Sequence, residues 1–289
     1  MDAPTTLAHG PHAAALLSLF LPLFLVGCAM TTRDVPTSSS AVRVEIEIEQ
    51  SVDRITDAPV GREFASVRAV LRNEKGKAIE ADGMQVLLNG EPLLFSVGQG
   101  NYYDRYPAYH ASDEQLARLG PGAECRFEVA WPDGTRHPAG AVRLAGQLAP
   151  EAFDVPTLFR TDQDYTFSWR ALEIPAQVVV YRGYTYPDEF GNAVQLVGSR
   201  DEKKNLRKTI GPGFLRGASG RMVVPKSYFK DQPGESVSGM KPMKVNALSV
   251  EVSAEVVAGA GPDFHPASRI HAKRLLLFYM EAVGDTLRG

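Results

Sequence analysis

The sequence predicts an all-β protein that consists of two β-sandwich domains in tandem. In VRVEIEIE, residues 42–49, apolar side chains alternate strictly with charged ones, which is the period of a half-buried strand. Further segments of the same kind are separated by short turn sequences rich in Gly, Asn, Asp and Pro. With 26 Gly and 20 Pro in 289 residues, the composition suits a protein rich in strands and turns.

The first domain is expected over residues 42–146. Its predicted strands after residues 42–49 are 64–73, 84–93 and 123–131. Asn89-Gly90 predicts a tight hairpin turn, because both residue types tolerate positive φ. One helix is expected at residues 112–120, where Ser112 is placed to cap the first turn and Gln115 completes a capping box.

The second domain is expected over residues 147–289, with an insertion at 187–217. Its predicted strands are 164–172, 176–186, 220–225, 244–257 and 267–283. The length of the first domain, and the Trp, VVVY strand and two long C-terminal strands of the second, resemble bacterial immunoglobulin-like modules without the paired cysteines of antibodies. The resemblance implies two immunoglobulin-like β-sandwiches.

The N-terminal region predicts a cleaved signal. Residues 13–26 are almost entirely apolar, a length that fits the ~7–15 residues of a signal peptide and falls short of the ~20 of a spanning helix. Directly after them, Leu25-Val26-Gly27-Cys28 resembles the lipobox of bacterial lipoproteins. A short buried helix and an uncleaved membrane anchor are the alternatives.

The lipobox resemblance implies how the chain is processed. Cleavage falls between Gly27 and Cys28, so that residues 1–27 are the signal peptide, and Cys28 carries a diacylglyceryl group and an acylated amine, such as a palmitate amide. Residues 28–41, rich in Ser and Thr, are expected to be the lipidated cysteine and a flexible tether. Ala29 follows the cysteine, which by the same resemblance favours the periplasmic face of the outer membrane in a Gram-negative cell.

The sequence predicts no catalytic residue, metal site or cofactor. Ser227–Lys230 has the S-x-x-K spacing of penicillin-recognising enzymes, but it lies between a predicted strand and a Pro-Gly loop, and its companion motifs are missing. Cys125 falls on the apolar face of residues 123–131, which indicates a core residue. A formal net charge of −3 argues against a nucleic-acid partner.

A tyrosine-rich segment is the candidate binding surface. Tyr side chains give large, rigid contact areas that suit proteins and glycans, and an exposed loop is expected here. The candidate residues are Tyr102, Tyr103, Arg105, Tyr106, Tyr109 and His110. The alternative is that this loop packs its own rings over one end of the sandwich.

Together these observations predict a lipid-anchored, non-catalytic protein of the cell envelope that binds, or structurally supports, an envelope protein or glycan. The membrane is its partner through Cys28. An envelope hydrolase with an unrecognised site, and an accessory factor of a secretion or surface assembly system, are the alternatives.

Overall fold

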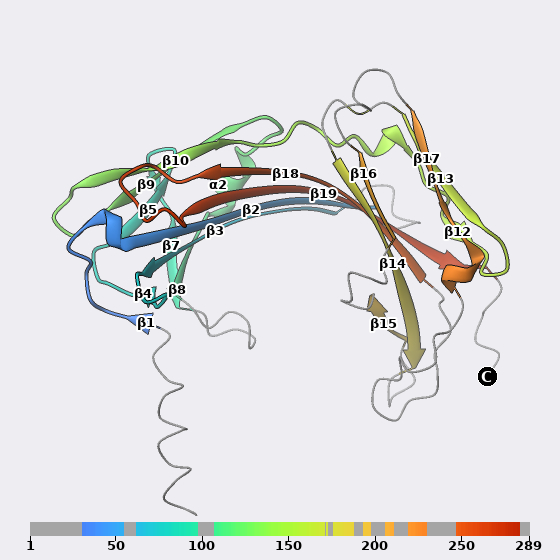
Figure 1. Ribbon diagram of the computed structural model, residues 1–289, viewed down its shortest axis with the longest axis horizontal. Helices are drawn as coiled ribbons and strands as arrows, with labels where there is room; N and C mark the ends of the chain where they lie inside the picture. Colours follow the sequence, from blue (N-terminus) through green and yellow to red (C-terminus); the bar gives the residue numbers. More distant parts are fainter. Residues whose placement is uncertain are drawn as a thin grey trace, which may run out of the picture.

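The protein forms an elongated, arched body built almost entirely of strands (Figure 1). The computed structural model describes residues 31–54, 62–97, 107–170, 172, 176–187, 193–197, 206–210, 219–229 and 247–283. The all-β prediction is therefore confirmed for these residues, and the 5-residue α2 (Asp113–Ala117) is the α-helix within them.

The elements follow in chain order. Those of the N-terminal half are β1 (Thr31–Thr32), η1 (Ser39–Ala41), β2 (Val42–Arg54), β3 (Arg62–Asn73), β4 (Ala78–Ile79), β5 (Gln85–Leu88), β6 (Glu91–Pro92), β7 (Leu94–Val97), β8 (Pro107–His110), α2, β9 (Glu124–Ala130) and β10 (Arg136–Arg143). Those of the C-terminal half are η2 (Pro150–Ala152), β11 (Phe153–Asp154), β12 (Leu158–Phe159), β13 (Tyr165–Trp169), β14 (Ala176–Pro187), β15 (Ala193–Val197), β16 (Leu206–Ile210), β17 (Gly220–Val224), η5 (Lys226–Phe229), β18 (Ala247–Gly259) and β19 (Arg269–Ala282).

One large sheet runs the length of the molecule, in the order β1-β4-β3-β2-β19-β18-β14-β15. At its centre β19 pairs antiparallel with β18 and parallel with β2, so that Ile270 lies opposite Ile46. Two smaller sheets complete the fold, one in the order β10-β9-β5-β6 and the other in the order β11-β13-β17. The central strands curve along the arch in Figure 1.

The two hydrophobic cores lie on the same face of the large sheet. In the first, Ile46 of β2 packs in a cluster with Phe127 of β9. In the second, Leu276 of β19 packs in a cluster with Trp169 of β13. Because side chains alternate along a strand, the even-numbered residues of β18 and β19 face both cores in turn.

The sequence predicts a boundary between two domains at residue 147, but the two hydrophobic cores do not divide the chain there. Ile270 and Ala272 belong to the first core, whereas Leu276 of the same strand belongs to the second. Between them the register places Gln50 beside Arg274, and Arg274 Nη1 donates to Gln50 Oε1 at 3.4 Å. The two layered units thus share continuous strands, and the polar pair Gln50–Arg274 lies between their cores on β2 and β19.

Residues 31–41 are not the flexible tether that the Ser- and Thr-rich composition predicted. Thr31 and Thr32 form β1, which pairs parallel with Ala78 and Ile79 of β4. Further along, the Trp131 indole N–H donates to the carbonyl oxygen of Pro36 at 3.1 Å. Backbone pairing and this bond hold the segment against the body, and composition alone does not reveal such partners.

Local features of the first half agree with the sequence. Asn89 and Gly90 both have positive φ, 52° and 85°, and connect β5 to β6 as a hairpin. The capping box of α2 joins Ser112 and Gln115 in both directions. In the predicted insertion at 187–217, β15 and β16 are described, and both pair with β14.

We predict that Ser268→Ala lowers the free energy of unfolding by about 1–3 kcal/mol. The Ser268 hydroxyl accepts the backbone N–H of Val44 at 2.9 Å, 224 positions away, and both groups are buried. Removing it leaves a buried donor without a partner. Chemical denaturation measures the effect, and Ser96→Ala on the exposed β7 is the control. Equal stabilities of the two variants contradict the role of this bond.

Candidate functional site

Most of the predicted site residues lie outside the described part of the chain. These are Gly27, Cys28, Tyr102, Tyr103, Arg105 and Tyr106. The processing site and the front of the tyrosine segment therefore stay predictions. Tyr109 and His110 are described, and both lie on β8.

Tyr109 is a core residue and does not belong to an exposed surface. Its side chain is 2% exposed, and its hydroxyl donates to the backbone carbonyl of Met84 at 3.1 Å. Burial raises the pKa of the phenol to about 12. The expected exposure of the tyrosine loop is thus wrong at this position, where the ring packs in the first core, while neighbouring His110 is partly exposed.

Cys125 is buried, as its place on the apolar face of β9 indicates. The side chain is 0% exposed and lies in the first core with Phe127 and Val129. Burial raises the pKa of its thiol to about 11, which keeps the thiolate form scarce near neutral pH. The residue therefore acts as a small apolar side chain.

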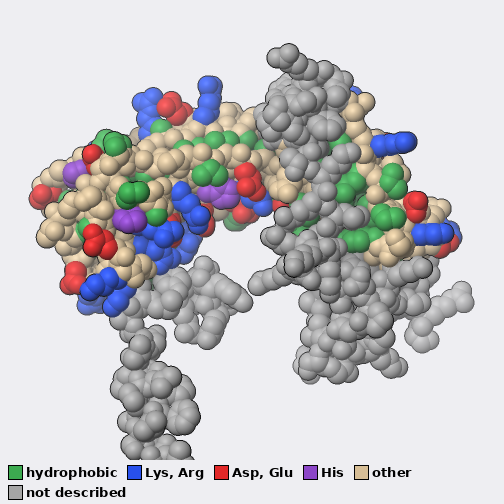
Figure 2. All heavy atoms as spheres, viewed as in Figure 1, with side chains coloured by type: hydrophobic (Ala, Val, Ile, Leu, Met, Phe, Trp, Pro, Cys, Tyr) green, Lys and Arg blue, Asp and Glu red, His purple; other side chains and the backbone are tan. Residues whose placement is uncertain are grey.

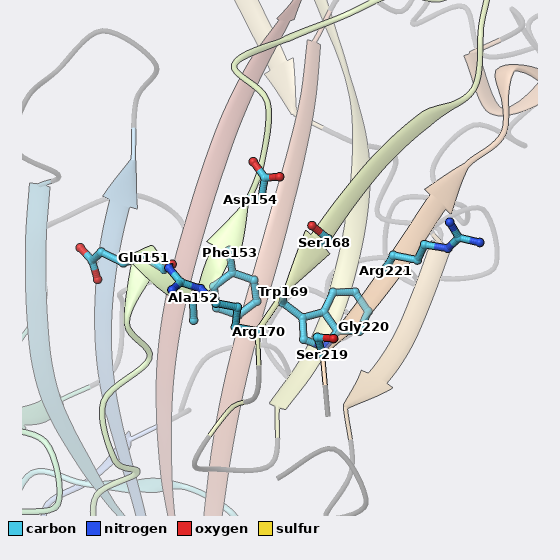
Figure 3. Close-up of a pocket in the computed structure, with 10 residues that line it drawn as sticks. All are labelled: Glu151, Ala152, Phe153, Asp154, Ser168, Trp169, Arg170, Ser219, Gly220 and Arg221. Atoms are coloured by element: carbon cyan, nitrogen blue, oxygen red, sulfur yellow. The ribbon is translucent and has the colours of Figure 1, made fainter. Parts of the chain in front are cut away.

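A pocket of about 730 Å³ lies on the small sheet of the C-terminal half (Figure 3). The register places Asp154 of β11, Ser168 of β13 and Arg221 of β17 in one row across the three strands. The next row holds Phe153, Trp169 and Gly220. Sequence reasoning missed this pocket, because its polar row comes from strands that are distant in the chain and carries no motif.

The charged groups of this pocket do not converge on one point. In Figure 3 Glu151 and Arg221 lie at opposite ends of the pocket. Arg170 is held near the edge, since its side chain donates to the Glu151 carbonyl oxygen at 2.6 Å. The pocket thus has a row of three polar side chains, from Asp154, Ser168 and Arg221, with Glu151 and Arg170 at its edge.

Trp169 and Gly220 form the floor of this pocket and depend on each other. A Cβ atom on Gly220 would lie 2.2 Å from Cζ2 of the Trp169 indole. Trp169 is 2% exposed and anchors the second core. The glycine is therefore needed here for the close approach of the ring.

A second pocket, of about 760 Å³, lies on the four-stranded sheet of the N-terminal half. Pro138 and Gly140 of β10 line it where the register of β9 and β10 shifts. On the same pocket wall, Arg126 and Glu124 form an ion pair at 3.1 Å. Glu128 also lines the pocket and pairs with Arg136 at 3.9 Å, so its charged side chains are held in ion pairs typical of an ordinary sheet surface.

Charged side chains also gather beneath the arch, on the face of β2, β3, β18 and β19 opposite the cores (Figure 2). They pair across strands: Arg72 with Glu45 at 2.9 Å, and Lys273 with Glu251 at 3.1 Å. Both pairs are partly buried, and each joins side chains of opposite charge on neighbouring strands. The face is therefore a polar surface with balanced charge, without a strong field of one sign.

The described residues contain neither a cluster of metal-ligating side chains nor a helix that could cross a membrane. No group of three or more His, Cys, Asp or Glu is placed there to hold a metal ion. None of the helices in the same residues is long and apolar enough to span a membrane.

Comparison with known proteins does not assign a family. No protein-family model and no curated protein matches the chain. Among solved structures, the yeast delta-COP-I mu-homology domain is similar at a TM-score of 0.24 and 7% sequence identity, covering 86% of this chain and 98% of that chain. A likeness at this level carries no argument about function.

We predict that Cys125 makes the protein less stable at alkaline pH. Its folded-state pKa, about 11, lies above the unfolded value of 9.0, so the stability it contributes is present below about pH 9 and is lost as the pH rises through 11. Between about pH 8 and 10.5 the loss from this thiol is about 2 kcal/mol. Urea denaturation at both pH values should show that the free energy of unfolding falls less in Cys125→Ala than in the unsubstituted protein, by that amount. An identical loss in both proteins contradicts it.

We predict that Gly220→Ala lowers the free energy of unfolding by about 1–3 kcal/mol, because the new methyl group overlaps the Trp169 indole. Thermal denaturation and tryptophan emission measure the effect. Gly259→Ala is the matched control, because it also lies in a strand and a Cβ there meets nothing within 4 Å. If both variants melt alike, the contact is not tight.

Proposed function

We propose that this chain is a lipid-anchored, non-catalytic protein of the bacterial cell envelope, held through a diacylglyceryl group on Cys28 after cleavage behind Gly27. Its layered body serves as a binding or structural module for an envelope protein or glycan. The favoured location is the periplasmic face of the outer membrane. The observation that carries the proposal is the lipobox Leu25-Val26-Gly27-Cys28 at the end of a short apolar run.

The attachment of residues 31–41 supports this proposal. Only Ala29 and Met30 separate Cys28 from β1, and the Glu80 N–H donates to the Thr32 carbonyl oxygen at 2.7 Å. A lipid on Cys28 therefore holds the folded body close to the membrane. Several acyl chains anchor a protein stably where a single chain does not.

The surfaces favour binding over catalysis. Glu151 and Arg221 lie at opposite ends of the pocket in Figure 3, whereas a hydrolase needs its acid, base and nucleophile together. Each end of the long sheet carries a second sheet across a hydrophobic core. The immunoglobulin-like character of these two units belongs to the same proposal, and layered sheets of this kind commonly serve as binding scaffolds.

We predict that Cys28→Ser abolishes lipid attachment and releases the protein from membranes, because the thioether bond requires the cysteine sulfur. Labelling with a palmitate analogue should fall to background, and fractionation should move nearly all of the protein to the soluble fraction. Cys125→Ala is the matched control, since it removes the other cysteine of the chain and should leave labelling unchanged.

A Cys28→Ser protein that still takes up label, or that stays fully bound to membranes, contradicts the proposed anchor. Once the anchor is established, crosslinking of the lipidated protein in its native envelope tests the second part of the proposal. A specific envelope protein or glycan should be crosslinked to the layered body, and conversion of an envelope ester or amide by the purified protein would instead support a hydrolase.

A further inference from the structure

The strand β7 exposes apolar side chains at the edge of the large sheet. Leu94 is 61% exposed on one face of the strand, and Phe95, 46% exposed, and Val97, 45% exposed, lie on the other, where the Phe95 ring also packs against Tyr109 with 5.1 Å between ring centroids. Among the described residues β7 pairs only with β8, so its outer edge has no neighbouring strand there. Natural proteins usually protect an edge strand with charges, proline or a bulge, and clustered exposed apolar residues commonly mark a contact surface.

The same sheet edge carries β1, the first described element of the chain. Both β4 and β8 pair with β3 along one side, β4 at Arg72 and β8 at Arg68. β1 lies outside β4, and β7 lies outside β8. Val70, Ala78 and Ala108 form a small buried cluster that joins these strands. Figure 1 shows β1, β4 and β8 together at the lower left of the molecule.

The distance from β1 to Cys28 is short. Two residues, Ala29 and Met30, lie between Cys28 and Thr31, and three extended steps of chain span at most about 10 Å. This step rests on the lipid anchor of the proposed function. An acyl group on Cys28 must then enter the membrane close to the edge that holds β1 and β7.

We propose that this edge lies on the bilayer surface, and that Leu94, Phe95 and Val97 enter the boundary between headgroups and acyl chains. The anchor supplies the affinity, and β7 fixes the orientation. Three side chains bind a membrane weakly by themselves, but tethering beside the surface raises their effective concentration. Arg33 follows β1 at the same edge; its side chain is 85% exposed and forms a long ion pair with Glu80 at 3.9 Å, an exposed pair that leaves its other N–H groups able to contact anionic headgroups.

The test uses the full lipidated protein, purified from membranes and reconstituted into vesicles of phosphatidylethanolamine and phosphatidylglycerol. Phe95→Trp places a fluorophore on β7. Phosphatidylcholine brominated along the acyl chain, added to the vesicles, should quench the additional emission at least twofold. The unsubstituted protein, with Trp131 and Trp169, gives the baseline. Val223→Trp on β17 is the matched control, because Val223 is also 46% exposed but lies in the other unit, and it should not be quenched.

The outcomes separate this inference from the anchor. If the protein is lipidated and bound to the vesicles but neither Phe95→Trp nor Leu94→Trp is quenched, the membrane-facing edge is wrong and the anchor stands. If no lipid is attached at Cys28, the proposed anchor and the membrane-facing edge are both wrong. If the Phe95→Trp emission shifts to the blue without lipid, and the shift depends on protein concentration, the edge contacts a second copy of the chain and the membrane-facing edge is wrong.

Discussion

The parallel pairing of β19 with β2 is the contact on which the rest of the fold depends. It joins a strand that begins at residue 42 to one that begins at residue 269, and it places both at the middle of the large sheet. On its other side β19 pairs with β18 along all 13 residues of that strand. Without these central strands neither smaller sheet has a complete surface to cover, because both cores use residues of β19.

The register also decides what each face of the sheet presents. Since side chains alternate, one face of β19 carries Ile270, Ala272 and Leu276 toward the cores. On the other face His271 lies within hydrogen-bonding distance of Glu255, and Lys273 forms an ion pair with Glu251. The exception on the core face is Arg274, which bonds to Gln50 where one core ends and the next begins. The two hydrophobic clusters thus lie along the same continuous strands, with this polar pair between them on β2 and β19.

Local sequence signals predicted local structure well. The alternation at residues 42–49, the Asn89-Gly90 turn and the Ser112 cap are all found, because each is set by neighbouring residues. The same signals failed where partners are distant. The Ser- and Thr-rich segment at 31–41 is held by Trp131 and β4, and the row of Asp154, Ser168 and Arg221 exists only through strand pairing. The predicted exposure of Tyr109 was wrong because its hydroxyl bonds to the backbone carbonyl of Met84, a distant partner that no sequence pattern indicates.

The arrangement of β2 and β19 bears on how the protein is made. During synthesis the N-terminal half emerges long before Ile270 and Ala272, which complete its core. The contact between β2 and β19 closes a long loop, and contacts of high sequence separation form slowly because the entropy of loop closure opposes them. Removal of β19 would therefore take residues from both hydrophobic cores at once, so the two layered units depend on a single strand for their stability.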